Sequence, residues 1–296
     1  MRLCKKIVTA FYEKVIDRLF ILPLRISFFF RREVGHDYNM DFMAKLRLIL
    51  KFRHTLRRID TLSTWLEHLE MTAAILQIPP TVQGDIIECG CYKGGSTINL
   101  SLVCSIVGRK LIVCDSFQGL PNPRENERIR YSVHNNQYDY YEGGKFYAAL
   151  DEVQNNVKKF GCIEVCEFVV GYFDKTLPKL DKKYAMAFLD IGLIQSLEPC
   201  LRAIWPSLHQ GCKIFVHEAM DLGFVSLFFD KEWWHSNLHT DPPGFIGAGT
   251  GLPLEIRKGS ELGYAIKLAG DESDFSLTIG DQNQNIEFTT TPPLLC

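Results

Sequence analysis

The sequence predicts an α/β protein built on a doubly wound, mostly parallel β-sheet. From about residue 61 onward, short segments that are apolar throughout alternate with segments whose apolar side chains share one helical face. Strands that are apolar throughout are typical of parallel sheets that helices cover on both faces. The chain has 296 residues, of which 46% are hydrophobic and 23% charged, so it can fill one large core or two smaller ones.

The predicted elements follow one another in the order that such a sheet requires. A helix from residue 64 ends before Pro79 and Pro80, the strand "GDIIECG" follows, and a second helix starts near Gly95. The predicted strands are 84–90, 110–115, 164–171, 184–190, 212–218, 263–269 and 275–280, and the predicted helices are 64–78, 95–108, 146–160 and 197–208. We expect the last two strands to be partly antiparallel to the others.

Residues 1–60 differ from the rest of the chain in charge. They carry 14 Lys and Arg against 6 Asp and Glu, whereas residues 61–296 carry 19 against 29. The difference predicts two regions, a basic amphipathic helical arm at 1–60 and a ligand-binding domain at 61–296. Within the arm, residues 41–60 are expected to form a helix that buries Phe42 and Phe52 and turns Lys45 toward solvent.

The arm contains an apolar stretch, residues 19–30, which Pro23 and Arg25 interrupt and which is shorter than the ~20 residues that span a bilayer. We expect the arm to pack on the domain or on a second subunit, as in a homo-oligomer. The alternative is peripheral contact of residues 1–32 with an anionic membrane surface. No aromatic-interleaved basic motif accompanies the arm, so nucleic acid is not an expected partner.

Ten cysteines with neither a secretory signal nor zinc-knuckle spacing indicate a cytoplasmic protein.

The residues that end each strand are the first candidates for a binding site, because ligands of such sheets lie beyond the carboxyl ends of the strands. The first strand ends in Glu88 and Gly90, and Asp115 ends the second, 27 residues after Glu88. Asp115 can accept hydrogen bonds from both hydroxyls of a ribose. The first turn reads E-C-G-C-Y-K-G-G instead of G-x-G-x-x-G, and a carboxylate at that place repels a pyrophosphate. These residues favour S-adenosylmethionine, a positively charged nucleoside, over NAD.

Several strand ends belong to longer motifs. They read "GDIIECGCYKGGST", "LIVCDSFQGLP" and "FVVGYFDKTLP", followed by "FLD" and "GCKIFV". Over residues 62–220 these motifs resemble the macrocin O-methyltransferase family, class I S-adenosylmethionine-dependent enzymes with a Rossmann-like sheet that methylate sugar hydroxyls of natural products. The resemblance implies three groups of cofactor contacts: Glu88, Gly90 and Tyr92 at the methionine end, Asp115 and Ser116 at the ribose, and Gly171, Tyr172 and Phe173 near the adenine.

The chain departs from the family pattern where the family holds a magnesium ion and its general base. Family members usually have an L-D-x-D-x-Y-x-S run after the fourth strand and a V-D-D pair after the fifth. Here Asp190 keeps the first acid, Gly192 replaces the second, and His217 with Glu218 replaces the pair. These three remain candidate catalytic residues and ligands for a divalent metal, and the imidazole favours manganese, iron or zinc over magnesium. Alternatively no metal binds, and His217 or Glu218 is a lone base or a structural group; of the two, His217 is the better candidate to remove the proton of the acceptor.

Two segments outside the motifs are candidates for contact with the acceptor. Residues 122–146 form a long polar insert with side chains that could stack on a sugar, namely Tyr131, His134, Tyr138, Tyr140 and Tyr141. The glycine-rich residues 241–256 lack the Lys-Ser/Thr pair of a phosphate-binding loop and are expected as a loop near the site. The sequence thus predicts an S-adenosylmethionine-dependent O-methyltransferase for a small hydroxylated molecule. The alternative is a catalytically impaired relative that acts through its basic arm as a partner or membrane adaptor.

Overall fold

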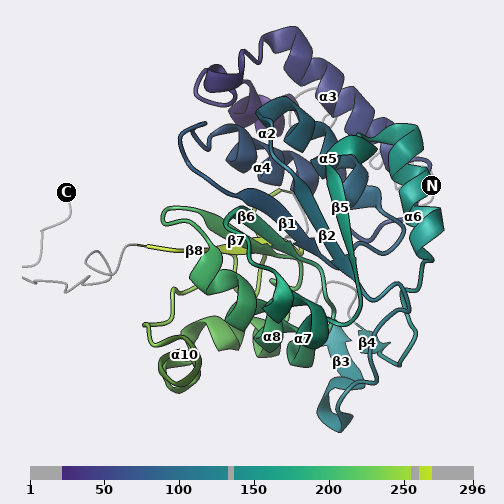
Figure 1. Cartoon of the computed structure of the whole chain (residues 1–296), viewed down its shortest axis with the longest axis vertical. Helices are drawn as coiled ribbons and strands as arrows, with labels where there is room; N and C mark the ends of the chain where they lie inside the picture. Colours follow the sequence, from purple (N-terminus) through teal and green to yellow (C-terminus); the bar gives the residue numbers. More distant parts are fainter. Residues whose placement is uncertain (1–21, 133–136, 255–259, 269–296) are drawn as a thin grey trace, which may run out of the picture.

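The computed structural model describes residues 22–132, 137–254 and 260–268. Its centre is a six-stranded sheet in the order β5-β2-β1-β6-β7-β8, in which only β8 runs antiparallel to its neighbour (Figure 1). The strands are β1 (Asp85–Cys89), β2 (Leu111–Asp115), β5 (Cys166–Val170), β6 (Tyr184–Leu189), β7 (Lys213–Val216) and β8 (Gly263–Ile266). The predicted mostly parallel, doubly wound sheet is confirmed. The strand expected at 275–280 lies outside the described residues.

Helices cover both faces of the sheet (Figure 1). One face carries α3 (Phe42–Thr55), α4 (Trp65–Leu76), α5 (Gly95–Val107) and α6 (Leu150–Phe160), and the other carries α7 (Phe173–Thr176), α8 (Ile194–Ile204) and α10 (Lys231–Leu238). The remaining α-helices of the described residues are α2 (Leu22–Ile26) and α9 (Leu222–Val225), and β3 (Ile129–Ser132) pairs with β4 (Gln137–Tyr140) in a separate hairpin. Short 3-10 helices lie at Ser27–Phe30, His36–Tyr38, Glu125–Glu127, Ile163–Val165, Leu177–Lys179, Trp205–Ser207 and Ser226–Phe229.

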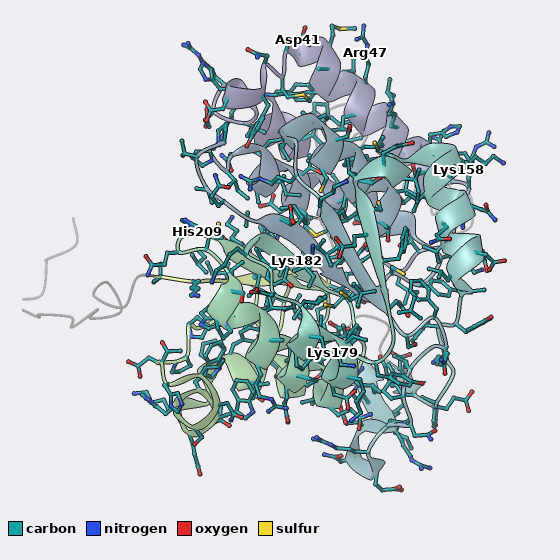
Figure 2. The ribbon with its side chains drawn as sticks, viewed as in Figure 1. Asp41, Arg47, Lys158, Lys179, Lys182 and His209 are labelled. Atoms are coloured by element: carbon teal, nitrogen blue, oxygen red, sulfur yellow. The ribbon has the colours of Figure 1, made fainter. Side chains whose placement is uncertain are left out.

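The core lies between the central strands and these two helical layers. Every residue of β6 is buried, and Ile86, Ile87 and Cys89 of β1 have no exposed surface. Strands buried on both faces explain why the sequence shows unbroken apolar segments rather than alternation. The outer helical faces carry charged side chains, and Arg47 and Lys158 point into solvent (Figure 2).

The described part of the N-terminal region packs against the sheet's helices. Asp41 caps α3 by accepting the Ala44 N–H at 2.6 Å, and Phe52 is fully buried, as expected. Two expectations for this helix are wrong: Phe42 is 61% exposed, and Lys45 is buried, with its ammonium donating to the Arg31 carbonyl at 2.8 Å. The helix is rotated toward the segment before it, which provides a carbonyl for the lysine.

Within the described residues, every helix is too short or too polar to span a bilayer. Residues 1–21 lie outside that part of the chain, and with them most of the segment expected to touch a membrane. The division of the chain at residue 60 stays a prediction.

Candidate active site

A cavity of about 780 Å³ opens at the carboxyl ends of the parallel strands. It brings together most of the residues selected from the sequence: Gly90, Tyr92, Asp115, Ser116, Tyr172, Phe173, Asp190, His217 and Glu218 all line it. Two of the selected residues, Glu88 and Gly171, are not among those that line it. The position agrees with the general rule that ligands of such sheets bind beyond the strand ends.

Glu88 lies beneath the cavity with no exposed surface. Both its carboxyl oxygens accept hydrogen bonds from α5, one from Ser96 Oγ at 2.5 Å and one from Thr97 Oγ1 at 2.6 Å. Burial raises the pKa of Glu88 to about 8, although the two hydroxyl groups act in the opposite direction. Since Ser96 lines the cavity, Glu88 is linked to the ligand space through this serine.

Gly90 allows β1 to end directly beside the end of β6. Its φ is 85°, and a Cβ at this position would stand 1.8 Å from the backbone oxygen of Asp190. A side chain there would force apart the two strand ends that carry the site.

We expect Gly90→Ala to destabilise the protein by about 1–3 kcal/mol more than Gly108→Ala, because only the first creates a clash with backbone. Gly108 is a matched control, with φ of 68° but no atom within 4 Å of the added Cβ. Both changes share the strain of a left-handed residue. Urea unfolding curves measure the difference. Equal losses in the two variants would contradict the close approach.

The carboxylate of Asp115 is held in a fixed orientation at the end of β2. One oxygen accepts the N–H of Cys91 at 2.9 Å and the other accepts the N–H of Phe117 at 2.8 Å. Each oxygen retains a second lone pair, so the group can still accept two hydrogen bonds from a ligand. The neighbouring Ser116 hydroxyl donates to the Gly119 carbonyl at 2.7 Å and thereby shapes the turn that follows.

The end of β5 supplies two rings to the cavity wall. Gly171 donates its N–H to the Asp115 carbonyl at 2.9 Å and has a φ of 136°, which turns the chain into α7. Tyr172 and Phe173 follow it and line the cavity, and Tyr172 is 36% exposed. Gly171 therefore positions the rings without facing the ligand space itself.

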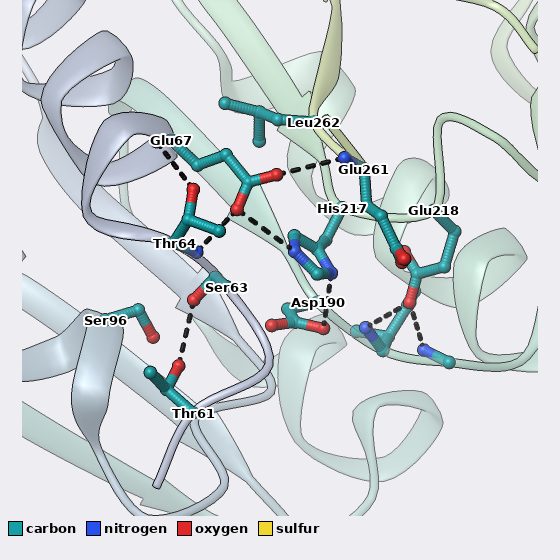
Figure 3. A network of polar contacts seen from close by, with 12 residues as sticks. Thr61, Ser63, Thr64, Glu67, Ser96, Asp190, His217, Glu218, Glu261 and Leu262 are labelled. Carbon is teal, nitrogen blue, oxygen red and sulfur yellow. Dashed lines mark hydrogen bonds and ion pairs between the residues drawn. The ribbon is translucent and has the colours of Figure 1, made fainter. Parts of the chain in front are cut away.

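His217 lies between two carboxylates (Figure 3). Its Nε2 is 3.6 Å from Glu67 Oε2 and its Nδ1 is 3.6 Å from Asp190 Oδ1. Burial by itself lowers the pKa of His217, but Asp190 and Glu67 outweigh it and hold this pKa well above the ordinary value. An imidazole in such a place carries a proton at neutral pH, so it is a cation rather than a free base.

Glu67 is a site residue that the sequence reasoning missed. The side chain closes a capping box at the start of α4, where Oε2 accepts the Thr64 N–H at 2.6 Å (Figure 3). Burial raises the pKa of Glu67, but His217 and the Thr64 hydrogen bonds bring it down to about 2. The available signal was T-x-x-E, which predicts a helix start and nothing about the histidine.

Glu218 lines the cavity and has one buried side-chain oxygen without a hydrogen-bond partner in the described part of the chain. Oε1 accepts the N–H groups of Ile191, at 3.0 Å, and Gly192, whereas Oε2 has no hydrogen-bond partner among the described residues. Burial, followed by the charge of Asp190, raises the pKa of Glu218 to about 7. Burial also raises the pKa of Asp190, against the effect of His217. Of the three expected catalytic groups, Glu218 is the one poised to exchange a proton near neutral pH.

The same three residues do not fit a divalent metal. Both ring nitrogens of His217 face carboxylates, Glu218 uses one oxygen on backbone amides, and Gly192 has no side-chain ligand. Across the described ranges there is no group of three or more His, Cys, Asp or Glu side chains arranged to hold a metal ion. The arrangement differs from the oxygen-rich coordination that magnesium and manganese require.

The polar insert forms the β3-β4 hairpin beside the cavity. Tyr141 lines the cavity, but Tyr138 and Tyr140 are 62% and 65% exposed. His134 and the side chain of Tyr131 lie outside the described part of the hairpin. In the loop at 241–256, Gly249 donates its N–H to the Ala219 carbonyl at 2.8 Å, directly after Glu218. Among the described residues of this loop, none lines the cavity.

Comparison with known proteins gives consistent matches. The chain is 26% identical over 168 residues to the 8-demethyl-8-(2,3-dimethoxy-alpha-L-rhamnosyl)-tetracenomycin-C 4'-O-methyltransferase of Streptomyces olivaceus, covering 55% of this chain and 60% of the relative. It is 26% identical over 144 residues to the demethyldecarbamoylnovobiocin O-methyltransferase of Streptomyces niveus, covering 47% of this chain and 54% of the relative. The chain thus spans between half and two thirds of the length of these curated relatives.

The solved structure of the O-methyltransferase NovP has the same fold, with a TM-score of 0.57 at 18% identity over 76% of this chain and 99% of that one. The family model of the macrocin-O-methyltransferases (TylF) matches residues 56–231, more than half of the chain and all the strand ends that line the cavity. The chain belongs to the macrocin-O-methyltransferase (TylF) family.

Proposed function

We propose that this protein transfers the methyl group of S-adenosylmethionine to a hydroxyl group of a small molecule, such as a sugar on a natural product. One observation carries the proposal in a chain of this family: Glu218, whose buried Oε2 has no hydrogen-bond partner among the described residues, lines the same cavity as Asp115, whose carboxylate is held in a fixed orientation. The first suits the removal of a proton, and the second suits the binding of a nucleoside.

The residues at the β1 and β2 ends fit S-adenosylmethionine. Asp115 would accept hydrogen bonds from the ribose hydroxyls, since backbone amides hold both its oxygens in place. Tyr172 and Phe173 would flank the adenine, and Tyr92 with Ser96 would line the methionine end. When bound, S-adenosylmethionine supplies a methyl group already activated by its sulfonium. Glu88 would act through Ser96, because its own oxygens are occupied by hydroxyl groups.

The acceptor would bind at the acid end of the cavity, the part lined by Asp190, His217 and Glu218. Glu218 Oε2 would take the proton of the attacking hydroxyl, which general-base catalysis requires within hydrogen-bond reach. His217 would stay protonated between Glu67 and Asp190 and keep the Asp190 carboxylate in place. Tyr141 and the hairpin would close the acceptor side and hold the hydroxyl in line, a contribution that can reach ~7–11 kcal/mol in well-oriented reactions.

Asp115→Ala is expected to weaken S-adenosylmethionine binding by about 10-fold to 100-fold or more, because each lost charge-assisted hydrogen bond contributes about 1.5–3 kcal/mol. Isothermal titration calorimetry with the cofactor and its demethylated product measures the change. Asp181→Ala is the control, since this exposed residue lies before β6, at the opposite end of the sheet. Equal affinity in Asp115→Ala and the wild type would remove Asp115 from the site.

The activity itself is tested with methyl-labelled S-adenosylmethionine and a panel of hydroxylated acceptors. Rhamnosyl glycosides and demethylated novobiocin compounds come first, because one curated relative is named for a rhamnosyl tetracenomycin and the other for a demethyldecarbamoylnovobiocin. Cofactor-dependent labelling of one acceptor class would support the proposal. Calorimetry that detects neither S-adenosylmethionine nor its demethylated product would refute it.

A cytoplasmic location, a homo-oligomer and membrane contact through residues 1–32 stay predictions from the sequence. Gel filtration with light scattering tests the oligomer, and sedimentation with anionic vesicles tests the membrane contact. Among the described residues, nothing favours a catalytically impaired adaptor over the methyltransferase.

A further inference from the structure

A guanidinium group reaches from the hairpin to the acid end of the cavity. Arg130 on β3 has one terminal nitrogen 2.5 Å from Asp221 Oδ2, and the other donates to the carbonyl of Gly192. Its side chain is 12% exposed, and its Cζ lies 4.1 Å from the ring centroid of Tyr141. Ion pair, hydrogen bond and cation–π contact together fix the charge in one place.

Gly192 is held from both sides by these contacts. Its N–H donates to Glu218 Oε1, and its carbonyl accepts from Arg130. Glu218 is thus tied to the hairpin through the backbone of one residue, Gly192. Asp221, the other partner of Arg130, also caps α9 by accepting the Phe224 N–H at 3.2 Å.

The donors around this point suit a guanidinium better than a metal ion. A divalent cation needs several free oxygens converging at short range. Here Gly192 offers a carbonyl that Arg130 already uses, and Asp221 is paired with Arg130. A planar guanidinium donates hydrogen bonds to two acceptors at once and stacks on an aromatic ring, which a metal ion cannot do.

We propose that Arg130 is a resident cation beside Asp190, His217 and Glu218, and that it holds the loop at 190–193, Glu218 and the hairpin together at the place where the family pattern has its magnesium ligands. Arg130 is a positioning residue, because it acts through Gly192 and Asp221 and is not among the residues that line the cavity. One consequence, methyl transfer without added metal, rests on the proposed function. The other two, the absence of a Mn²⁺ site and the ordering of the loop by Arg130, do not depend on it.

The first measurement is a titration of the full chain with Mn²⁺, followed by calorimetry and by electron paramagnetic resonance. We expect no saturable Mn²⁺ site in the wild type. A saturable site that is lost in Glu218→Gln would overturn the proposal, whether or not methyl transfer has been found.

The second measurement is hydrogen exchange of the Ile191 and Gly192 amides and of the hairpin amides. We expect exchange about tenfold or more faster in Arg130→Met than in the wild type. Arg130→Lys should restore part of the protection, because it keeps the positive charge but lacks the planar set of N–H donors that serves two acceptors. Arg128→Met is the matched control, since Arg128 is 59% exposed at the start of the same hairpin and pairs only at 3.5 Å with exposed Glu125. Unchanged exchange in Arg130→Met would also overturn the proposal.

The third measurement separates this inference from the proposed function. Chelator should leave wild-type methyl transfer unchanged, and Arg130→Met should lower kcat while the Kd for S-adenosylmethionine stays the same. Absence of cofactor binding in the wild type would count against the methyltransferase proposal alone. Inhibition by chelator that Mn²⁺ reverses would count against Arg130 alone.

Discussion

Glu218→Gln is expected to lower kcat by about 10²–10⁴-fold, the usual contribution of a general base. The amide can still accept hydrogen bonds from Ile191 and Gly192, but it cannot take a proton at the position of Oε2, which has no hydrogen-bond partner among the described residues. The Kd for S-adenosylmethionine should stay close to the wild-type value, because the cofactor contacts lie at the β1, β2 and β5 ends. Steady-state kinetics and calorimetry on one preparation measure both quantities.

The pH dependence provides an independent check on Glu218. A carboxyl group with a pKa of about 7 must be ionised to accept a proton, so wild-type kcat should rise with pH through about 7. The pKa of Glu218 in the folded protein lies above the ordinary 4.5, so the folded state binds more protons than the unfolded state between pH 4.5 and about 7. The free energy of unfolding therefore falls as pH rises through this range. Glu218→Gln should therefore raise Tm at pH 8 while it removes activity, which separates catalysis from unfolding. Unchanged turnover in Glu218→Gln, with loss in His217→Ala, would return the base role to His217.

Glu67→Gln is expected to cost about 3–5 kcal/mol of stability at pH 5.5, because it leaves the buried His217 cation without one of its two carboxylates. The Glu67 pKa of about 2 lies below its ordinary 4.5, so its contribution is present above 4.5 and is lost as pH falls toward 2. The raised pKa of His217 gives the opposite sign: its contribution is complete below 6.5 and is lost in alkaline solution. The difference between wild type and variant should be largest between these limits.

Urea unfolding at pH 3, 5.5 and 9 measures that difference. Glu152→Gln replaces an exposed carboxyl of α6 and should stay within about 0.5 kcal/mol of the wild type throughout. Equal unfolding midpoints for Glu67→Gln and wild type at pH 5.5 would show that the ion pair contributes no net stability. A difference that grows steadily toward pH 9 would contradict a contribution that depends on the protonated His217.

The strand ends could be predicted from the sequence because they are local features. Asp115 follows an apolar strand, and Gly90 follows another, so a parallel sheet brings both to one edge whatever the helices do. The motifs at these strand ends also predicted the family, which the match of the family model over residues 56–231 confirms. The orientation of α3 could not be predicted in this way, because its apolar stripe does not fix which side of the helix faces the core. Phe42 faces solvent, and Lys45 is buried against the Arg31 carbonyl.

The sequence by itself determined the sheet, the family and the edge at which the site lies, since these depend on hydrophobic period and on residues next to each other in the chain. Only the tertiary structure decided the chemistry of that site. The Glu67 carboxylate of α4 contacts the Glu261 amide 194 residues away and His217 just after β7, and Arg130 contacts Asp221 91 residues away. Protonation depends on such distant charges and on burial, which no local pattern records. That is why His217, the expected base, is a cation in the fold, and why the free oxygen belongs to Glu218.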